Sequence, residues 1–223
     1  MSTHIAQIAA GVAASVPDSR RALIGIDGAD GSGKTTFATA LVDELAPRPV
    51  IVIHADDFLN PSAVRHARGR QSPDGFWLDS YNYDALIEHT LAPLGSRGDG
   101  WYRPASFDPD ADAVISPEMR LAPERSLVLV EGMFLHRDEL AGRWDFSIFL
   151  DVPFAETARR MAVRDGSHTD PGHESMRRYV EGQRIYFRTA RPWERASIVV
   201  DNARAWSPRI IPAAAASAAS AVK

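Results

Sequence analysis

The stretch Gly28-Ala29-Asp30-Gly31-Ser32-Gly33-Lys34-Thr35, followed by Thr36, contains every fixed position of the pattern G-x-x-x-x-G-K-[ST]. The apolar residues 23–27 before it indicate a buried strand, and residues 37–41 after it indicate a helix. We expect the glycines to let backbone N–H groups turn inward around a phosphate chain, beside the positive end of the helix. Lys34 would reach the outer phosphates, and the Thr35 hydroxyl would take a place on Mg²⁺. The alternative is a glycine-rich turn without a ligand, which the complete pattern in its strand–helix frame disfavours.

The length and composition limit the architecture and the class of partner. A chain of 223 residues suits one domain, which we expect at residues 1–206, followed by an alanine-rich C-terminal tail at 207–223, in which residues 213–222 predict a frayed helix or a disordered segment. The net charge of −4 offers no cationic surface for nucleic acid, so we expect a small-molecule partner. The absence of cysteine excludes disulfides and fits a reducing compartment. Residues 5–16 favour a first helix over a signal sequence or a membrane span, so we expect a cytoplasmic protein, with a homodimer left open.

Four further apolar runs indicate strands, at residues 50–54, 126–130, 146–151 and 197–201. With the first strand they predict an α/β three-layer sandwich, a mostly parallel five-stranded sheet with helices on both faces. Ligands bind at the carboxyl edge of such sheets. We therefore expect Asp56 and Asp57 beside the phosphate-binding loop, and Glu131 to orient Mg²⁺ directly or through water. The alternatives are a turn cap at the aspartates and a strand-end glutamate without a role.

Two other segments are expected at this edge. Residues 98–117 predict a hairpin-like insert with an acidic turn, 108–112, that suits solvent better than calcium. Two arginine-bearing helices flank a breaker at 165–167 and predict a lid over about 164–178 that closes over the phosphates. The arginines concerned are Arg159, Arg160, Arg164, Arg177, Arg178 and Arg184, for which a solvated surface is the alternative. Asp79 lies in an aromatic cluster suited to a ring and its hydroxyls, or else caps the next helix.

These stretches together resemble the uridine kinase, phosphoribulokinase and nicotinamide riboside kinase group of P-loop kinases. The resemblance covers about residues 23–202 and is carried, in order, by residues 28–36, His54-Ala55-Asp56-Asp57-Phe58, Glu131-Gly132, Arg160 with Arg164-Asp165, and residues 197–202. It implies the P-loop NTPase fold and transfer of the γ-phosphoryl of ATP, with Mg²⁺, to a hydroxyl of a nucleoside or ribosyl compound. By this resemblance Asp56 receives the acceptor hydroxyl, and Lys34, Arg160 and Arg164 complete the catalytic set. Thr35, Asp56 and Glu131 would hold the metal.

The resemblance also directs us to contacts with the two substrates. ATP is expected on the loop from Gly28 to Thr36, and the expected acceptor-binding residues are Asp56, Phe58, Asp79, Tyr81, Tyr102, Arg103 and Phe107. The chain departs from uridine kinases on the acceptor side. Residues 107–112 replace a histidine-containing hairpin, and residues 166–171 replace a compact glycine-arginine lid.

The identity of the acceptor therefore stays open. A nucleoside monophosphate is one alternative, and the candidates for its phosphate are Arg65, Arg68, Arg70 and Arg103. A sugar or a vitamin is another. An alternative of a different class is a regulatory protein that binds a nucleotide without catalysis.

Overall fold

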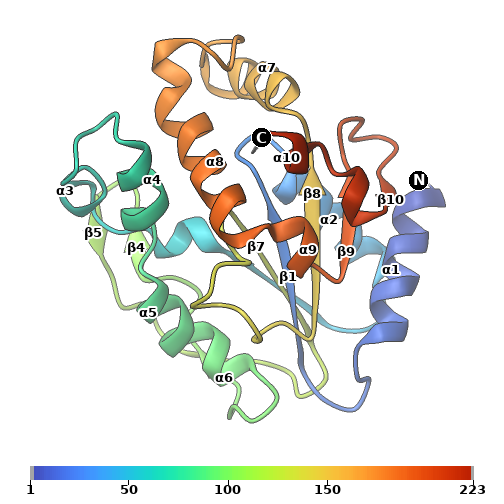
Figure 1. Ribbon diagram of the computed structural model, residues 1–223. Coiled ribbons are helices and arrows are strands. Elements are labelled where there is room, and N and C mark those ends of the chain that lie inside the picture. The colour runs from blue at the N-terminus through green and yellow to red at the C-terminus, as the bar shows by residue number, and fades with distance from the viewer. Residues whose placement is uncertain (1–2, 222–223) are drawn as a thin grey trace.

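The computed structural model describes residues 3–221, which fold around one central sheet (Figure 1). Its strand order is β10-β9-β8-β1-β7-β2. Five strands are parallel: β1 (Ala22–Gly28), β2 (Val50–His54), β7 (Leu127–Gly132), β8 (Phe146–Asp151) and β9 (Ile198–Asp201). The mostly parallel sheet expected from the apolar runs is thus confirmed. A sixth strand, β10 (Arg209–Ile211), was not expected and pairs antiparallel with β9.

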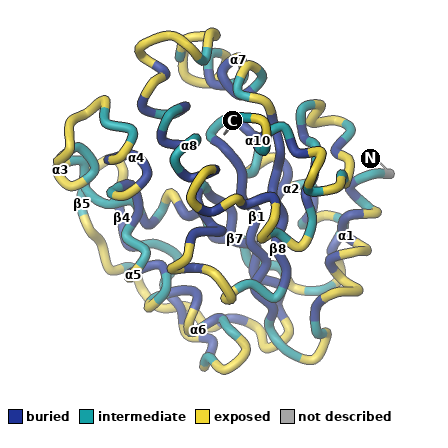
Figure 2. Tube along the Cα trace, viewed as in Figure 1, coloured by how far each residue is buried: buried dark blue, intermediate teal, exposed yellow. Residues whose placement is uncertain are grey.

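The strands contribute side chains to two apolar layers, one on each face of the sheet, because successive side chains of a strand point to opposite faces. On one face, Ile24 and Ile26 of β1 pack with α1 (Thr3–Ser15) and α2 (Lys34–Glu44). On the other face, Val128 and Val130 of β7 pack with α4 (Pro73–Asp79) and α8 (Arg177–Ala190). Figure 2 shows the strands buried between the two helical layers. The first helix is confirmed, and no helix within 3–221 has the length and apolar character to cross a bilayer.

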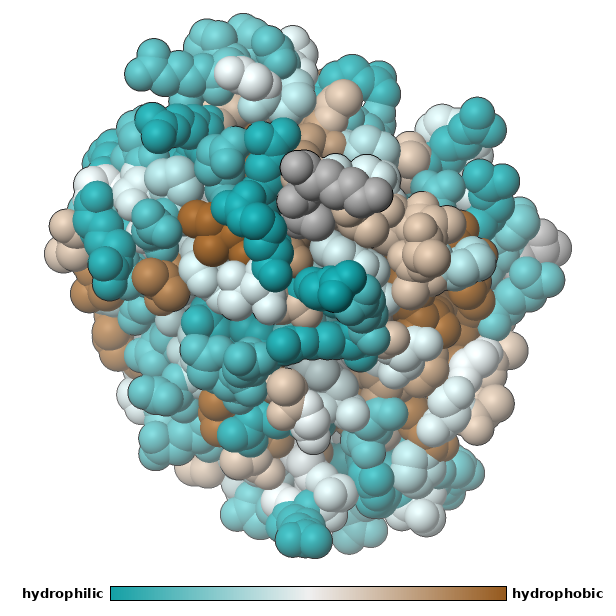
Figure 3. All heavy atoms as spheres, viewed as in Figure 1, coloured by the Kyte–Doolittle hydropathy of each residue, from teal (hydrophilic) through white to brown (hydrophobic). Residues whose placement is uncertain are grey.

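Short elements occupy the two long connections of the sheet, from β2 to β7 and from β8 to β9. Between β2 and β7 lie η1 (Ala55–Phe58), α3 (Ser62–Arg65), α4, and a helical stretch made of α5 (Tyr83–Leu86), η2 (Ile87–Leu91) and α6 (Ala92–Leu94). The expected insert forms two small antiparallel ladders, β3 (Trp101–Tyr102) with β6 (Arg120–Leu121), and β4 (Phe107–Asp108) with β5 (Ala113–Val114). After β8 come α7 (Phe154–Asp165), η3 (Glu174–Met176), α8 and α9 (Pro192–Arg195). Hydrophilic residues dominate the surface over α7 at the top of the view (Figure 3).

The C-terminal segment contains short helices, in line with one of the two expectations for it, but they pack on the domain instead of fraying. After β10, η4 (Ala213–Ala215) and α10 (Ser217–Ser220) fold back onto the domain. The Asp151 carboxylate, at the end of β8, accepts hydrogen bonds from the backbone N–H and hydroxyl of Ser217 and from the N–H of Ala218. Ala216 and Ala218 are buried against the core. An alanine-rich sequence is ordered here because a distant carboxylate binds the first turn of α10; residues 222–223 of the expected tail lie outside the described part.

Candidate active site

The phosphate-binding loop connects the fully buried strand β1 to α2. Gly31 and Gly33 have φ values of 75° and 87°, a left-handed conformation that side chains with a Cβ adopt rarely. A Cβ on Gly31 would also approach the Thr157 carbonyl oxygen to 2.6 Å. Gly33 precedes the first residue of α2 and offers no side-chain cap to the helix. The N–H groups of the first turn of α2 are therefore left for a ligand.

The base of this loop is fixed by a buried polar cluster. Asp27, the last residue before the loop, is fully buried and accepts a 2.7 Å hydrogen bond from the Gly28 N–H. Its second carboxylate oxygen lies 2.7 Å from Nδ1 of His136 and accepts a hydrogen bond from the Tyr186 hydroxyl of α8. A buried carboxylate with several partners resists displacement, because breaking any one of them leaves a charge without water. These contacts connect the base of the loop to α8, the helix that follows the expected lid.

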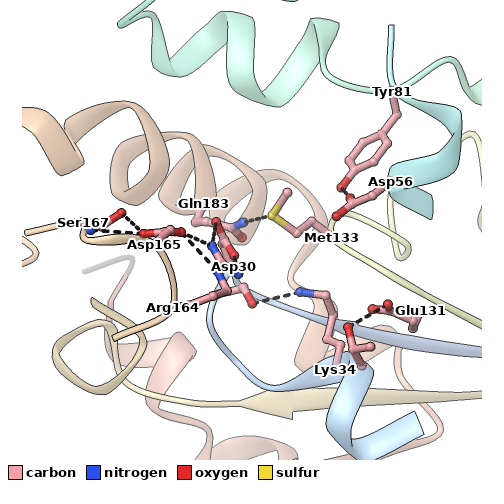
Figure 4. A network of polar contacts seen from close by, with 12 residues as sticks. Asp30, Lys34, Asp56, Tyr81, Glu131, Met133, Arg164, Asp165, Ser167 and Gln183 are labelled. Atoms are coloured by element: carbon pink, nitrogen blue, oxygen red, sulfur yellow. Dashed lines mark hydrogen bonds and ion pairs between the residues drawn. The ribbon is translucent and has the colours of Figure 1, made fainter. Parts of the chain in front are cut away.

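Lys34 and Thr35, the first two residues of α2, line a cavity of about 490 Å³, and Figure 4 shows the Lys34 side chain with its contact to the loop. The Nζ of Lys34 donates to the Ala29 carbonyl at 3.1 Å, and the Thr35 hydroxyl donates to Oε1 of Glu131 at 2.9 Å. The cavity is lined by Asp30, Gly31, Gly33, Lys34, Thr35, Thr36, Asp56, Glu131, Met133, Arg160 and Arg164. The loop and the carboxyl ends of β2 and β7 thus meet around one space.

The Thr35–Glu131 pair fits a magnesium ion. Within residues 3–221 no three His, Cys, Asp or Glu side chains are grouped to hold a metal by themselves. Mg²⁺ commonly takes only one or two carboxylates and completes its shell with phosphate oxygens and water. A hydroxyl and a carboxylate 2.9 Å apart in a phosphate-sized cavity match that donor set.

His54, at the end of β2, also contacts Glu131, with its Nδ1 2.7 Å from the same Oε1. The hydrogen bond to Glu131 raises the pKa of His54, against the opposing effect of partial burial. Burial alone would raise the pKa of Glu131, but the His54 hydrogen bond, the Lys34 charge and the Thr35 hydroxyl together lower it. Glu131 is therefore held in its charged form, as a metal-orienting carboxylate must be.

Asp56 lies on the wall between this cavity and a second one. It stands in η1, directly after β2, and its Oδ1 accepts a 2.7 Å hydrogen bond from the Tyr81 hydroxyl (Figure 4). Burial and the neighbouring Asp56 charge raise the pKa of Tyr81 well above its usual value, so the hydroxyl stays a donor. The second cavity, of about 320 Å³, shares Asp30, Asp56 and Met133 with the first. The two cavities are thus adjacent and share two carboxylates, of which Asp30 is paired with Arg164 and Asp56, within residues 3–221, is not paired with a cation.

Arg160 and Arg164 of α7 both line the first cavity, and each is engaged with the loop. Arg160 donates to the carbonyl oxygens of Ser32, Asn202 and Ala203 at 2.9–3.2 Å. Arg164 pairs with Asp30 at 2.9 Å, and this contact raises the pKa of its guanidinium (Figure 4). The two expected lid arginines therefore lie where a phosphate chain would pass.

Of the seven expected acceptor-binding residues, six do not line either cavity; Tyr81, one of the six, contacts the site through its hydrogen bond to Asp56. The rings of Phe58, Tyr102 and Phe107 are buried in the core, at 0%, 7% and 2% exposure. Asp79 pairs with Arg68 at 2.9 Å, outside both linings. Arg103 donates to the Pro117 carbonyl and so braces the insert. Of the expected set, only Asp56 and its partner Tyr81 belong to the site; aromatic rings near a ligand edge equally well complete a core, and here they do.

The second cavity contains residues that the pattern analysis missed. Leu59, His66, Gln71, Met133 and Tyr179 line it, and none belongs to a motif with a fixed spacing. Met133 comes two residues after Glu131 and is held by a 3.1 Å contact from the Gln183 amide to its sulfur. The position of Met133, two residues after the recognisable strand-end residue Glu131, was the one sequence signal that could have identified it.

A further hollow of about 700 Å³ lies at the opposite edge of the sheet, near the amino ends of β2 and β7. Three of its charged side chains have partners: Arg125 pairs with Asp18 at 2.5 Å, and Arg48 donates to the backbone carbonyls of Pro17, Arg20 and Arg125. It shares no residue with the phosphate-binding loop, so we assign it no part in the site.

Comparison with known proteins gives a consistent relationship. Over 143 residues the chain is 30% identical to nicotinamide riboside kinase 1 of Homo sapiens, covering 64% of each chain. It is 28% identical over 145 residues to uridine kinase of Geobacillus kaustophilus, covering 64% of this chain and 66% of that one. The chain thus spans about two thirds or slightly less of these relatives.

The fold has close counterparts among solved structures. One described as a possible uridine kinase from Bacillus stearothermophilus superposes with a TM-score of 0.68 at 24% identity, covering 87% of this chain and 96% of that one. A sequence model of the Phosphoribulokinase / Uridine kinase family matches residues 23–177, which include β1, the phosphate-binding loop, Asp56, Glu131 and α7. The chain therefore belongs to the phosphoribulokinase and uridine kinase family.

Proposed function

We propose that this protein transfers the γ-phosphoryl group of ATP to a hydroxyl of a small molecule, a nucleoside or another ribosyl compound. The observation that carries the proposal is the position of Asp56, whose carboxylate lines both the phosphate-loop cavity and the adjacent cavity. A kinase needs a nucleotide site and an acceptor site that meet at one carboxylate, and this pair of cavities provides that arrangement. The kinase names of the relatives support the same conclusion. A cytoplasmic location, where ATP is available, accords with it.

The nucleotide would lie in the larger cavity. The loop amides and the N-terminus of α2 face its phosphates, and Lys34 would exchange the Ala29 carbonyl for a phosphate oxygen. Thr35 and Glu131 would hold the magnesium ion, which neutralises charge on the phosphates when bound. Arg164 would exchange Asp30 for the same phosphates as the lid closes, and Arg160 keeps the loop backbone in place.

The acceptor hydroxyl would lie against Asp56. A carboxylate is far too weak a base to ionise an alcohol beforehand, so Asp56 orients the oxygen and takes its proton late. The bond from the γ-phosphorus to the β–γ bridging oxygen breaks, a bond to the acceptor oxygen forms, and ADP leaves. Little bond formation to the nucleophile is needed in a loose transition state, so most of the rate enhancement comes from positioning and charge compensation.

An ADP-release assay with ATP and Mg²⁺ tests the proposal. The acceptors to compare are nucleosides, riboside vitamins, sugars, pantothenate and nucleotides. We expect acceptor-dependent ADP release with at least one of them. ATP binding without ADP release on any acceptor would refute catalysis and favour a regulatory nucleotide-binding protein.

The variant Asp56→Asn tests the role of the shared carboxylate. Loss of the proton acceptor should lower kcat by roughly 10²- to 10⁴-fold, because that is the usual contribution of a positioned general base. The affinity for a non-hydrolysable ATP analogue, measured by calorimetry, should stay near the wild-type value. Asp84→Asn, an exposed carboxylate outside both cavities, is the matched control. A collapse of nucleotide binding in the Asp56 variant would instead move this residue to the nucleotide side.

A further inference from the structure

The wall of the second cavity away from the phosphate-binding loop is cationic. Arg65, His66 and Arg70 reach it from the end of α3 and the loop that follows, and Arg178 reaches it from the first turn of α8. Within residues 3–221, neither Arg70 nor Arg178 forms an ion pair with a carboxylate, and the nearest carboxylate to Arg65 is Asp112 at 3.5 Å. Three guanidinium groups therefore line this cavity. Of its two carboxylates, Asp30 is paired with Arg164 and Asp56 accepts a hydrogen bond from Tyr81, and within the same described residues neither forms an ion pair with the three arginines.

The position of Arg178 makes this arrangement costly. Only 7% of the residue is exposed. Its guanidinium lies 5.5 Å from the Phe76 ring centre and donates a hydrogen bond to the Arg70 carbonyl at 2.5 Å. Burial lowers the pKa of Arg178, and the like charges of Arg65 and Arg70 lower it further. A buried cation without an anion destabilises the free protein, and an anion in the cavity would remove that penalty.

The insert holds this cationic wall in place. Asp112 accepts a 2.9 Å hydrogen bond from the Ser62 N–H and another from its hydroxyl, which joins the β4–β5 turn to the start of α3. Arg65 lies over the Phe107 ring at 5.7 Å and donates to the Asn60 carbonyl at 2.7 Å. Phe107 and Asp112 thus act as positioning residues for Arg65. Guanidinium groups fixed before binding lose little freedom when they bind an anion.

The two ends of the cavity differ in charge. Asp56 lies at the end shared with the phosphate-loop cavity, and the guanidinium groups belong to the second cavity alone. We propose that the phosphate acceptor carries an anionic group, a phosphate monoester or a carboxylate, which Arg65, Arg70 and Arg178 bind while its hydroxyl lies against Asp56. Arg68, close in sequence, is excluded from this subsite because Asp79 already neutralises it. The placement of the acceptor hydroxyl at Asp56 rests on the proposed kinase activity. The placement of the anionic group rests on the three arginines alone.

Matched pairs of acceptors test the proposal by kinetics. In the pairs uridine and uridine monophosphate, ribose and ribose 5-phosphate, and glycerol and glycerate, an anionic group takes the place of one primary alcohol, and the remaining hydroxyls are the candidate acceptors. We expect at least one anionic member to exceed its neutral partner by about tenfold or more in kcat/KM, chiefly through KM, because charge-assisted hydrogen bonds to guanidinium groups are strong. Equal or better use of the neutral member in every pair would overturn the proposal. The phosphate and carboxylate pairs also show which anion is bound.

Two variants separate the subsite from general effects of charge. Arg70 is exposed, so Arg70→Gln should fold normally and raise KM for the anionic acceptor by about tenfold, with kcat nearly unchanged. Arg178→Gln should act in the same direction. Arg188→Gln removes one exposed positive charge from the same helix α8, outside both cavities, and should leave KM unchanged. An equal effect of all three variants would contradict a specific subsite.

A binding measurement decides the inference without turnover. Inorganic phosphate or acetate is titrated into protein saturated with Mg²⁺ and a non-hydrolysable ATP analogue, so that the phosphate-binding loop is already filled. We expect saturable binding of one of these anions that Arg70→Gln weakens about tenfold and Arg188→Gln does not. Binding of neither anion would refute the subsite even for an active kinase. Anion binding without turnover on any acceptor would leave the subsite supported and the kinase proposal refuted.

Discussion

Asp56 shows how one residue acquires a role through its neighbours. Its carboxylate stands at the end of β2, and among residues 3–221 its side chain accepts a single hydrogen bond, from Tyr81. An isolated antiparallel β-bridge between Leu59 and Tyr81 holds the backbone of Tyr81 in place. The tyrosine therefore orients the carboxylate toward the space shared by the two cavities.

Replacement of this hydroxyl tests the positioning role. Tyr81→Phe should lower kcat by about tenfold, because one lost hydrogen bond frees the carboxylate to leave its productive orientation. The affinity for the ATP analogue and the KM for the acceptor should change much less. Tyr83→Phe is the matched control, since the buried Tyr83 hydroxyl makes no hydrogen bond to Asp56 and its ring lies 5.7 Å from that of Tyr81. A parallel fall of kcat in both variants would indicate a packing effect instead.

At the scale of elements, the end of β8 supports the C-terminal segment. The carboxylate of Asp151 receives three hydrogen bonds from the first turn of α10, and the backbone carbonyl of the same residue accepts from Asn202 after β9. Asn202 in turn donates through its side chain to the Ser32 carbonyl of the phosphate-binding loop at 2.8 Å. One strand end thus connects α10, β9 and the loop.

Removal of this cap should cost stability. Asp151→Ala should lower the free energy of unfolding by about 1–2 kcal/mol, the usual cost of deleting a helix cap, as measured by urea denaturation. Ser217→Ala, which deletes only the hydroxyl contact and keeps the two N–H donors, should cost clearly less. If Asp151→Ala were as stable as the wild type, α10 would not be held by this carboxylate.

At the scale of the whole molecule, α8 brings the two cavities together. Its first turn supplies Arg178 to the second cavity, Gln183 contacts Met133 on the shared wall, and Tyr186 reaches Asp27 at the base of the loop. The ring of Tyr186 also packs against those of Trp77 and Phe134 in the core. A ligand in either cavity therefore contacts a part of the fold that α8 stabilises.

Nucleotide binding should stabilise the entire fold by mass action. At a concentration of ATP analogue and Mg²⁺ about 100 times the dissociation constant, the native state gains about 2.7 kcal/mol. For a domain of this size we expect a rise in Tm of about 5–10 °C in a thermal-unfolding scan. Lys34→Ala should lose most of that rise, and chelation of Mg²⁺ with EDTA should reduce it. An unchanged response of the lysine variant would argue that the nucleotide binds elsewhere.

The sequence alone determined the frame of this protein. The fixed spacing from Gly28 to Thr35 requires a strand before it and a helix after it, so a local pattern was sufficient to place the loop. Four further apolar runs of strand length, alternating with helical segments, then implied a parallel sheet, whose strands have their carboxyl ends at one edge. Asp56 and Glu131 followed from that edge without any tertiary information.

Tertiary structure decided what depends on contacts between distant residues. The rings of Phe58, Tyr102 and Phe107 could equally have faced a ligand, and packing placed them in the core. The alanine-rich terminus is ordered because Asp151, 66 residues away along the chain, caps it. The cationic wall exists because α8 brings Arg178 against Arg70, 108 residues earlier. Sequence spacing does not predict such long-range contacts. Packing and burial, rather than local periodicity, determine which side chains share a cavity.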